Sequence, residues 1–99
     1  MTSLPVLVTA EAEIDLADAR DRYRAIDPVL ESGFRREVER CIAVISHMPE
    51  SHPLVFKSLR RVGLRRFPSF IIYAVFDDTL VVFGCIHARR DPTYWQSRA

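Results

Sequence analysis

The chain has 99 residues, of which 48% are hydrophobic and 27% are charged, and its formal net charge is +1. This size predicts one domain over residues 1–99, excludes a second, and suffices for a core without disulfides or a structural metal. No run approaches the roughly 18 apolar residues of a membrane span, and the first residues lack a signal-peptide pattern, so we expect a cytoplasmic protein without a membrane partner. Cys41 and Cys85 lie in periodic segments, which predicts reduced core thiols.

The small net charge hides an uneven distribution of charged residues along the chain. Residues 1–50 contain six Arg against ten Asp and Glu, a net charge of −4, whereas residues 51–99 contain eight Lys and Arg against three Asp, a net charge of +5. All basic residues but Lys57 are Arg, whose planar group suits bidentate recognition of carboxylate or phosphate. The second half is therefore a candidate surface for an anionic partner, although a solvated arginine-rich surface has the same composition.

The chain begins with a predicted strand and a predicted helix. Residues 4–8 form an apolar run that predicts an edge strand, because Pro5 cannot donate a ladder hydrogen bond. Thr9 then suits the N-cap of a helix over about residues 10–25. Acidic residues crowd the first turns of this helix, where they complement its dipole: Glu11, Glu13 and Asp15.

A second helix follows after a very short connection. Asp27 suits its N-cap and Pro28 its first position, and Pro49 supplies the stop. The short connection predicts an antiparallel hairpin whose two apolar stripes face a common surface. The stripe of the second helix consists of Leu30, Phe34, Val38, Cys41, Ile45 and Met48.

The second half of the chain changes to a period of two, which predicts strands. Val62 and Leu64 point to one side of the first of them, and Arg61 and Arg65 to the other. Residues 70–76 and 80–87 are apolar on both faces, as in central strands, with a tight turn over residues 77–79. The order βααβββ predicts an α+β fold in which a two-helix hairpin packs on a mostly antiparallel sheet of about four strands. Residues 88–98 are expected to pack back across the end of the sheet.

Several kinds of site can be set aside because their motifs are absent. The chain has no Gly-rich phosphate loop, no Gly-x-Ser-x-Gly elbow and no Cys-x-x-Cys motif. His47 and His52 lie on a helix end and in a loop, and Asp77 and Asp78 suit a turn, so we expect neither a metal nor a cofactor.

What remains is a group of basic and aromatic residues that the strand assignment gathers toward one side of the sheet. With a general base, an acid and guanidinium groups, this group has the residue types for metal-free RNA cleavage. The same side chains suit binding to an acidic protein or a nucleic acid without chemistry, and they also fit a solvated basic face. The group consists of Arg60, Arg61, Arg65, Arg66, His87, Arg89, Arg90, Tyr94 and Arg98.

Two stretches resemble toxins of the RelE/ParE superfamily from bacterial type II toxin–antitoxin modules. Residues 66–73, Arg-Phe-Pro-Ser-Phe-Ile-Ile-Tyr, are similar to the Arg-Phe-Pro-Tyr-x-Ile-x-Tyr strand of ParE-like members. Residues 87–98 are similar to their His-x-x-Arg-Asp-Pro-x-x-Trp-x-x-Arg ending, and residues 12–17 resemble the first helix. The resemblance covers residues 4–98 and implies the βααβββ fold of this superfamily.

The resemblance implies one of two activities, because RelE-like toxins cleave mRNA in the ribosomal A site whereas ParE-like toxins inhibit DNA gyrase. Arg61, Arg65 and Arg90 fill RelE-like positions, but Phe70 stands where the third-strand Arg would be. Losing one such guanidinium typically costs about 10²- to 10³-fold in rate, which favours the ParE-like branch without bond-making chemistry. Tyr94 lies within two residues of the C-terminal Tyr position of RelE-like members.

The resemblance also implies partners and a binding surface. The expected partners are a cognate antitoxin and DNA gyrase, with direct nucleic-acid binding only in the endoribonuclease alternative; a third alternative is an inactive module that binds antitoxin. Trp95 also suits a packing anchor for the tail. The alternative catalytic set is Arg61, Arg65, His87, Arg90 and Tyr94. The expected target-binding residues are Arg61, Arg65, His87, Arg89, Arg90, Trp95 and Arg98.

Overall fold

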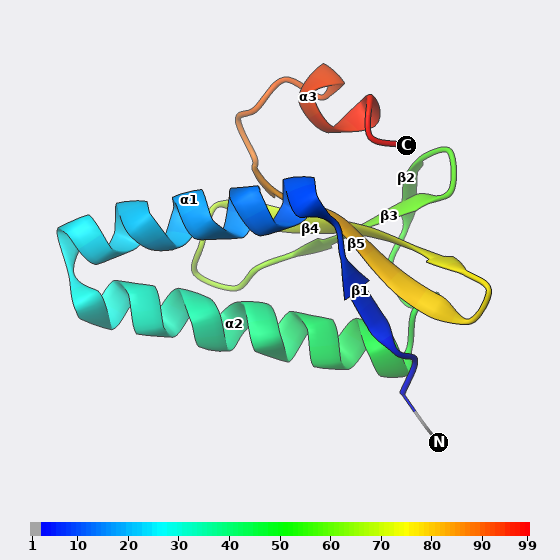
Figure 1. The fold of residues 1–99 in the computed structure, drawn as a ribbon, viewed down its shortest axis with the longest axis horizontal. Coiled ribbons are helices and arrows are strands. Elements are labelled where there is room, and N and C mark those ends of the chain that lie inside the picture. Colours follow the sequence, from blue (N-terminus) through cyan, green and yellow to red (C-terminus); the bar gives the residue numbers. More distant parts are fainter. Residues whose placement is uncertain (1–2) are drawn as a thin grey trace.

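The structure is a computed structural model that describes residues 3–99. Two long helices lie side by side as an antiparallel hairpin against a sheet, and a short C-terminal helix lies apart from them (Figure 1). The predicted α+β architecture is confirmed. The elements are β1 (Val6–Val8), α1 (Ala10–Ile26), α2 (Pro28–His47), β2 (Leu54–Phe56), β3 (Leu59–Gly63), β4 (Ser69–Phe76), β5 (Thr79–His87) and α3 (Thr93–Gln96).

The sheet has five strands in the order β1-β5-β4-β3-β2. β1 runs parallel to β5 at one edge, and all other neighbours are antiparallel. The strand missing from the sequence-based prediction is β2, whose three residues are too few to show a period of two. β1 is an edge strand as predicted, and the carbonyl of Pro5 still accepts a hydrogen bond from the Leu80 N–H at 2.9 Å.

A bulge in β5 changes which residues face the helices. Ile72 pairs with Gly84 but Tyr73 pairs with Val82, so Phe83 is an extra residue between the two pairs. Val82 before the bulge and Cys85 after it both pack in the core under the helices, although their sequence separation is odd. The bulge is one reason why this strand reads as apolar on both faces.

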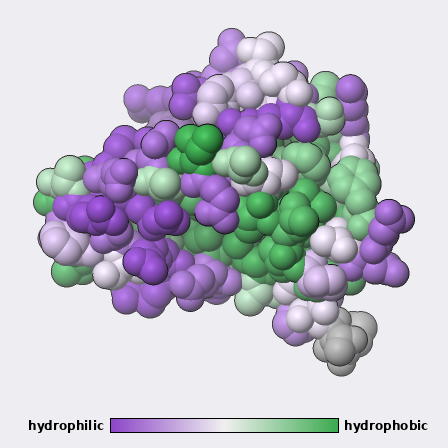
Figure 2. Space-filling model, in the orientation of Figure 1, coloured by the Kyte–Doolittle hydropathy of each residue, from purple (hydrophilic) through white to green (hydrophobic). Residues whose placement is uncertain are grey.

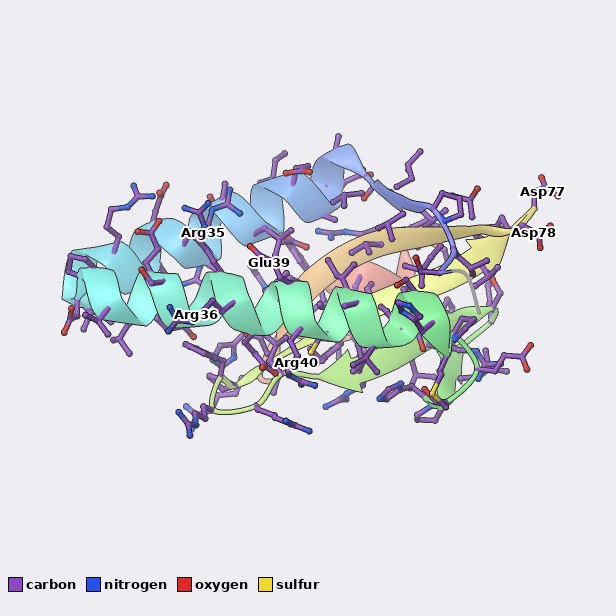
Figure 3. All side chains as sticks on the ribbon, turned by 90° about the horizontal axis from the view of Figure 1, so that it is seen from below. Arg35, Arg36, Glu39, Arg40, Asp77 and Asp78 are labelled. Carbon is purple, nitrogen blue, oxygen red and sulfur yellow. The ribbon has the colours of Figure 1, made fainter. Side chains whose placement is uncertain are left out.

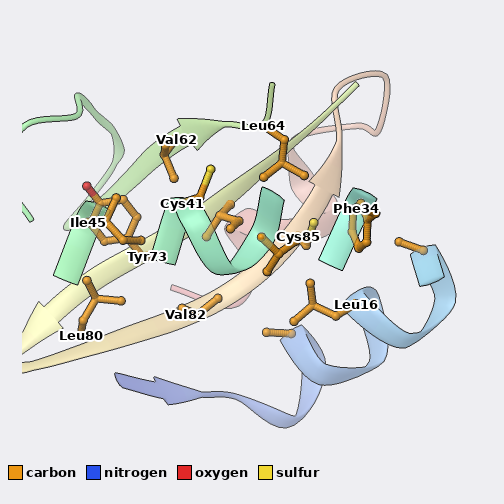
Figure 4. Packing of buried hydrophobic residues seen from close by; sticks show 14 residues of the cluster. Leu16, Phe34, Cys41, Ile45, Val62, Leu64, Tyr73, Leu80, Val82 and Cys85 are labelled. Carbon is orange, nitrogen blue, oxygen red and sulfur yellow. The ribbon is translucent and has the colours of Figure 1, made fainter. Parts of the chain in front are cut away.

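Two hydrophobic clusters cover the two faces of the sheet. The larger one lies between the sheet and the helices and contains Phe34, Ile45 and Tyr73 (Figure 4). The smaller one lies on the other face and includes Trp95, whose ring meets Phe70 edge to face at a centroid distance of 6.1 Å. The tail therefore packs back across the sheet, on the face opposite the helices.

Apolar side chains are also exposed near β1. In Figure 2 hydrophilic residues cover most of the helical hairpin, whereas hydrophobic residues gather toward the side where β1 lies. Val6 and Leu7 of β1 and Val44 near the end of α2 are among the exposed large apolar residues. This part of the surface has the composition of a contact for another chain.

The two cysteines are free and buried, as predicted, and their environments disfavour the thiolate form. Burial, together with the charge of Glu37, raises the pKa of Cys41 to about 11. Burial, together with the charge of Asp15, raises the pKa of Cys85 to about 12. Because the thiolate is the reactive form, we expect the folded protein not to react with Ellman's reagent at pH 8 and both thiols to react in denaturant. Rapid labelling of the folded protein would contradict this expectation.

Candidate functional site

The centre of the site is the carboxylate of Asp15, which is buried on the inner face of α1. It accepts hydrogen bonds from Arg98 Nη1 at 2.6 Å and Nη2 at 3.3 Å, and from the Tyr94 hydroxyl at 3.0 Å. The backbone N–H of Cys85 donates a further hydrogen bond at 3.1 Å. One carboxylate thus joins α1, β5 and the C-terminal tail. Sequence analysis assigned Asp15 only a role in complementing the helix dipole. Its position close to the apolar residues Ala12 and Leu16, which are buried, was the available signal that Asp15 is buried too.

Arg98 directs its guanidinium into the molecule. Nη1 also donates to the carbonyl of Phe83 at 3.0 Å, and the Arg98 side chain is only 11% exposed. Burial acts to lower the pKa of Arg98, but the hydrogen bonds and charge of Asp15 outweigh it and raise the pKa. Its role in the structure is therefore to hold the tail, and Trp95 likewise packs inside the smaller cluster.

The arrangement also fixes the direction of Arg90. The guanidinium carbon of Arg90 lies 3.9 Å from the centroid of the Tyr94 ring, and that of Arg98 lies 4.6 Å from it. Since the Tyr94 hydroxyl is bound to Asp15, the ring is a fixed support for Arg90. The exposed guanidinium of Arg90 is thereby held in place without being neutralised.

His87 and Arg90 meet Arg22 of α1 around a shallow hollow of about 260 Å³. A smaller hollow of about 40 Å³ adjoins it and is also lined by Asp18 and Tyr94. The N–H of Arg89 donates to Nδ1 of His87 at 3.1 Å, so the neutral ring carries its proton on Nε2. Within residues 3–99 neither Arg22 nor Arg90 is ion-paired with a carboxylate. The hollow can therefore bind an anionic or acidic group.

Sequence analysis missed Arg22, because nothing in its neighbourhood on the first helix distinguishes it from other exposed arginines. The register of β4 with β5 and the packing of α1 on β5 bring it to His87. Arg22 and His87 are 65 residues apart along the chain, so no local pattern relates them.

The structure divides the predicted basic group instead of gathering it on one side of the sheet. Arg61 lies on the face opposite the helices, with its guanidinium carbon 4.0 Å from the centroid of the Phe70 ring. Arg60 points the other way and donates to the carbonyl of His52 at 2.6 Å. Arg65 and Arg66 lie beside α2, and exposed Arg89 follows His87. The prediction that these basic residues gather on one side of the sheet is therefore wrong.

The alternative catalytic set is divided in the same way. Arg61 lies on the face opposite the helices, Arg65 lies beside α2 and His87 lines the hollow with Arg22, and the Tyr94 hydroxyl is bound to Asp15. Among residues 3–99 no three His, Cys, Asp or Glu side chains lie together where they could hold a metal ion. No helix in this range is both long and apolar enough to cross a membrane.

Glu37 joins α2 to the connection between β3 and β4. It accepts two hydrogen bonds from Arg40 at 2.8 Å and one from the Arg65 N–H at 2.6 Å. The Arg40 hydrogen bonds, helped by those from Arg65 and Cys41, hold the pKa of Glu37 at about 2, against the opposing effect of burial. Because its folded pKa is depressed, its contribution to stability is present above about pH 4.5 and is lost as the pH falls toward 2.

We expect Glu37→Gln to be less stable than the wild type at pH 7 and to approach its stability near pH 2. Urea denaturation of both proteins over this pH range measures the difference in the free energy of unfolding. A difference that stays constant with pH would show that the carboxylate charge does not carry the contribution.

Comparison with known proteins shows which known fold this structure resembles. No family model matches the chain, and no curated protein matches it. Among solved structures, the chain is similar to one described as the chromosomal ParDE TA system from P. aeruginosa, with a TM-score of 0.75 and 15% identity. The match covers 86% of this chain and 96% of that chain. The structure therefore has the ParE-like α+β fold that the sequence predicts.

Proposed function

We propose that this chain is a one-domain toxin of a type II toxin–antitoxin module, neutralised by a cognate antitoxin. The observation that carries the proposal is the fold, which 86% of this chain shares with 96% of a chain of a ParDE system. The exposed apolar side chains at the β1 edge, Val6 and Leu7, support it, because an antitoxin segment would cover them.

The target that we propose is DNA gyrase, bound without bond-making chemistry. The residue types needed for RNA cleavage are present, but the fold holds them at separate places. Buried Phe70 occupies the place of a third-strand Arg. Arg22, His87 and Arg90 remain together and accessible, and they suit an acidic surface on a partner. Binding in the manner of a ParE-like toxin therefore fits this chain better than catalysis in the manner of a RelE-like toxin.

Induction of the chain in bacteria tests the proposal. We expect growth arrest that co-expression of the cognate antitoxin relieves, and the purified protein should inhibit gyrase supercoiling while leaving ribosome-bound mRNA intact. Site-specific cuts in that mRNA, lost in Arg90→Ala, would support the endoribonuclease alternative instead. Normal growth after induction would point to an inactive module that binds antitoxin.

Arg90→Gln and Arg22→Gln are expected to weaken gyrase inhibition about tenfold or more each, the loss typical of an interface anchor. Both side chains are exposed, so the free energy of unfolding should change by less than about 1 kcal/mol. Supercoiling assays over a range of protein concentrations measure the effect, with exposed Arg35→Gln on α2 as the control. Equal inhibition by all three variants would remove this hollow from the proposed target surface.

A further inference from the structure

The ring of Tyr94 contacts two guanidinium groups whose surroundings differ. The guanidinium carbon of Arg98 lies 4.6 Å from the ring centroid, and this arginine forms an ion pair with buried Asp15. The guanidinium carbon of Arg90 lies 3.9 Å from the same centroid, but within residues 3–99 Arg90 forms no ion pair. One ring thus contacts an arginine that is neutralised inside the molecule and another that is exposed and charged at its surface.

The hydroxyl of Tyr94 holds the ring and strengthens its attraction for a cation. It donates to Asp15 Oδ1 at 3.0 Å, and the Asp15 side chain is only 5% exposed. Such a buried hydrogen bond is little weakened by solvent, so the ring keeps its position. Donation to a carboxylate also shifts electron density from the hydroxyl into the ring, which makes the face of the ring more negative. Asp15 therefore acts on Arg90 through the ring of Tyr94.

The attraction of Arg90 to the ring opposes a repulsion from Arg22 of α1. Arg22, His87 and Arg90 line the same hollow of about 260 Å³. Two cationic side chains around one hollow repel each other, and a free arginine side chain would turn away into solvent. The ring therefore keeps the charge of Arg90 beside that of Arg22, where both can act on one ligand.

The contact with the ring leaves the hydrogen-bonding edge of Arg90 free. A guanidinium carbon 3.9 Å over a ring centroid is typical of stacking through the flat face of the group. The N–H groups lie in the plane of the guanidinium, so they can still bind a carboxylate in a bidentate manner. A side chain that is already held also loses less conformational entropy on binding than a free one.

We propose that Tyr94 is a positioning residue for the contact of Arg90 with a carboxylate of the partner, and that Asp15 acts through it. The inference deepens the proposed binding of an acidic surface by the hollow and rests on it. In this role Tyr94 need not touch the partner, because its hydroxyl is already bound inside the molecule. In RNA cleavage, by contrast, the hydroxyl itself would give or take a proton.

Two substitutions separate the ring of Tyr94 from its hydroxyl. Tyr94→Phe keeps the ring and loses the bond to Asp15, whereas Tyr94→Leu loses both. NMR titration with a hexaglutamate peptide, followed at the resonances of His87, measures binding at the hollow. Ring-current shifts of the Arg90 side-chain protons report the contact with residue 94 in the free protein.

We expect Tyr94→Phe to keep most of the ring-current shift and to bind the peptide about twofold more weakly than the wild type. Tyr94→Leu should lose the shift and weaken binding about fivefold or more, as Arg90→Gln should. Adding Tyr94→Leu to Arg90→Gln should weaken binding no further, because the ring acts only through Arg90. Arg35→Gln is the control and should bind like the wild type, because exposed Arg35 lies on α2 and lines a different hollow (Figure 3).

A merely structural role for Tyr94 predicts different results. Equal losses in Tyr94→Phe and Tyr94→Leu, additive losses in the double variant, or a wild type without the ring-current shift would overturn the proposal. So would a wild type that does not bind hexaglutamate at the hollow. Supercoiling assays of the same variants are scored separately. A wild type that binds the peptide but does not inhibit gyrase would contradict the proposed target and leave the positioning role supported, so the two failures are distinguishable.

Discussion

Arg98→Met is expected to lower the free energy of unfolding by about 3–5 kcal/mol, because it leaves a buried carboxylate without its counter-charge. The Asp15 side chain is 5% exposed, and after the substitution only the Tyr94 hydroxyl and the Cys85 N–H remain to donate to it. The unbranched Met side chain matches the stem of Arg up to Nε, so packing along the stem is largely kept. Urea denaturation measures the loss.

The matched control is Arg24→Met, at an ion pair on the surface. Arg24 contacts Asp21 and Glu31, but its side chain is 54% exposed. Solvent screens such a pair, and we expect a much smaller loss than for Arg98→Met. If the two substitutions had similar costs, the buried network around Asp15 would not be what holds the tail.

Gly84→Ala is the second substitution with a large expected effect. A Cβ at this position would lie 2.7 Å from Arg98 Nη1, 2.9 Å from Asp15 Oδ2 and 2.9 Å from Ile86 Cδ1. A free arginine side chain could move away, but this one is bound to Asp15 at 2.6 Å. We therefore expect a loss of about 1–3 kcal/mol and faster amide hydrogen exchange in α3.

The double variant Gly84→Ala with Arg98→Met tests whether the two effects share a cause. With the guanidinium removed, one of the three close contacts disappears, so the combined loss should be smaller than the sum of the single losses. Strict additivity would mean that the cost of the alanine comes from the other two contacts.

Local signals predicted the helices well, because the groups that begin them are close together in sequence. The Thr9 hydroxyl accepts from the Ala12 N–H at 3.1 Å, and Asp27 accepts from the Val29 N–H at 2.9 Å. The sheet was predicted less completely. The edge strand β2 is too short to show a period of two, and the bulge at Phe83 can be identified only once the register of β4 and β5 is known.

The site was predicted only as a set of residue types. Strand alternation places Arg61 and Arg65 on one face, but β3 ends at Gly63, and the left-handed backbone at Arg66 belongs to a turn in which alternation no longer holds. The bonds of Asp15 to Tyr94 and Arg98 span 79 and 83 residues. Contacts at such separations depend on the whole fold, which no local pattern encodes.

The bond between Asp15 and Arg98 has a consequence for the order of events in folding. The helical hairpin consists of neighbouring segments and can form as soon as residues 10–47 have been synthesised. The sheet cannot be completed at that stage, because β1 pairs with β5. The tail cannot be held in place either, because its bond to Asp15 requires Arg98. Closing such long loops is slow relative to forming a local hairpin. A nascent chain therefore carries an unfinished sheet until β5 has emerged, and the hollow lined by Arg22, His87 and Arg90 is complete only after that.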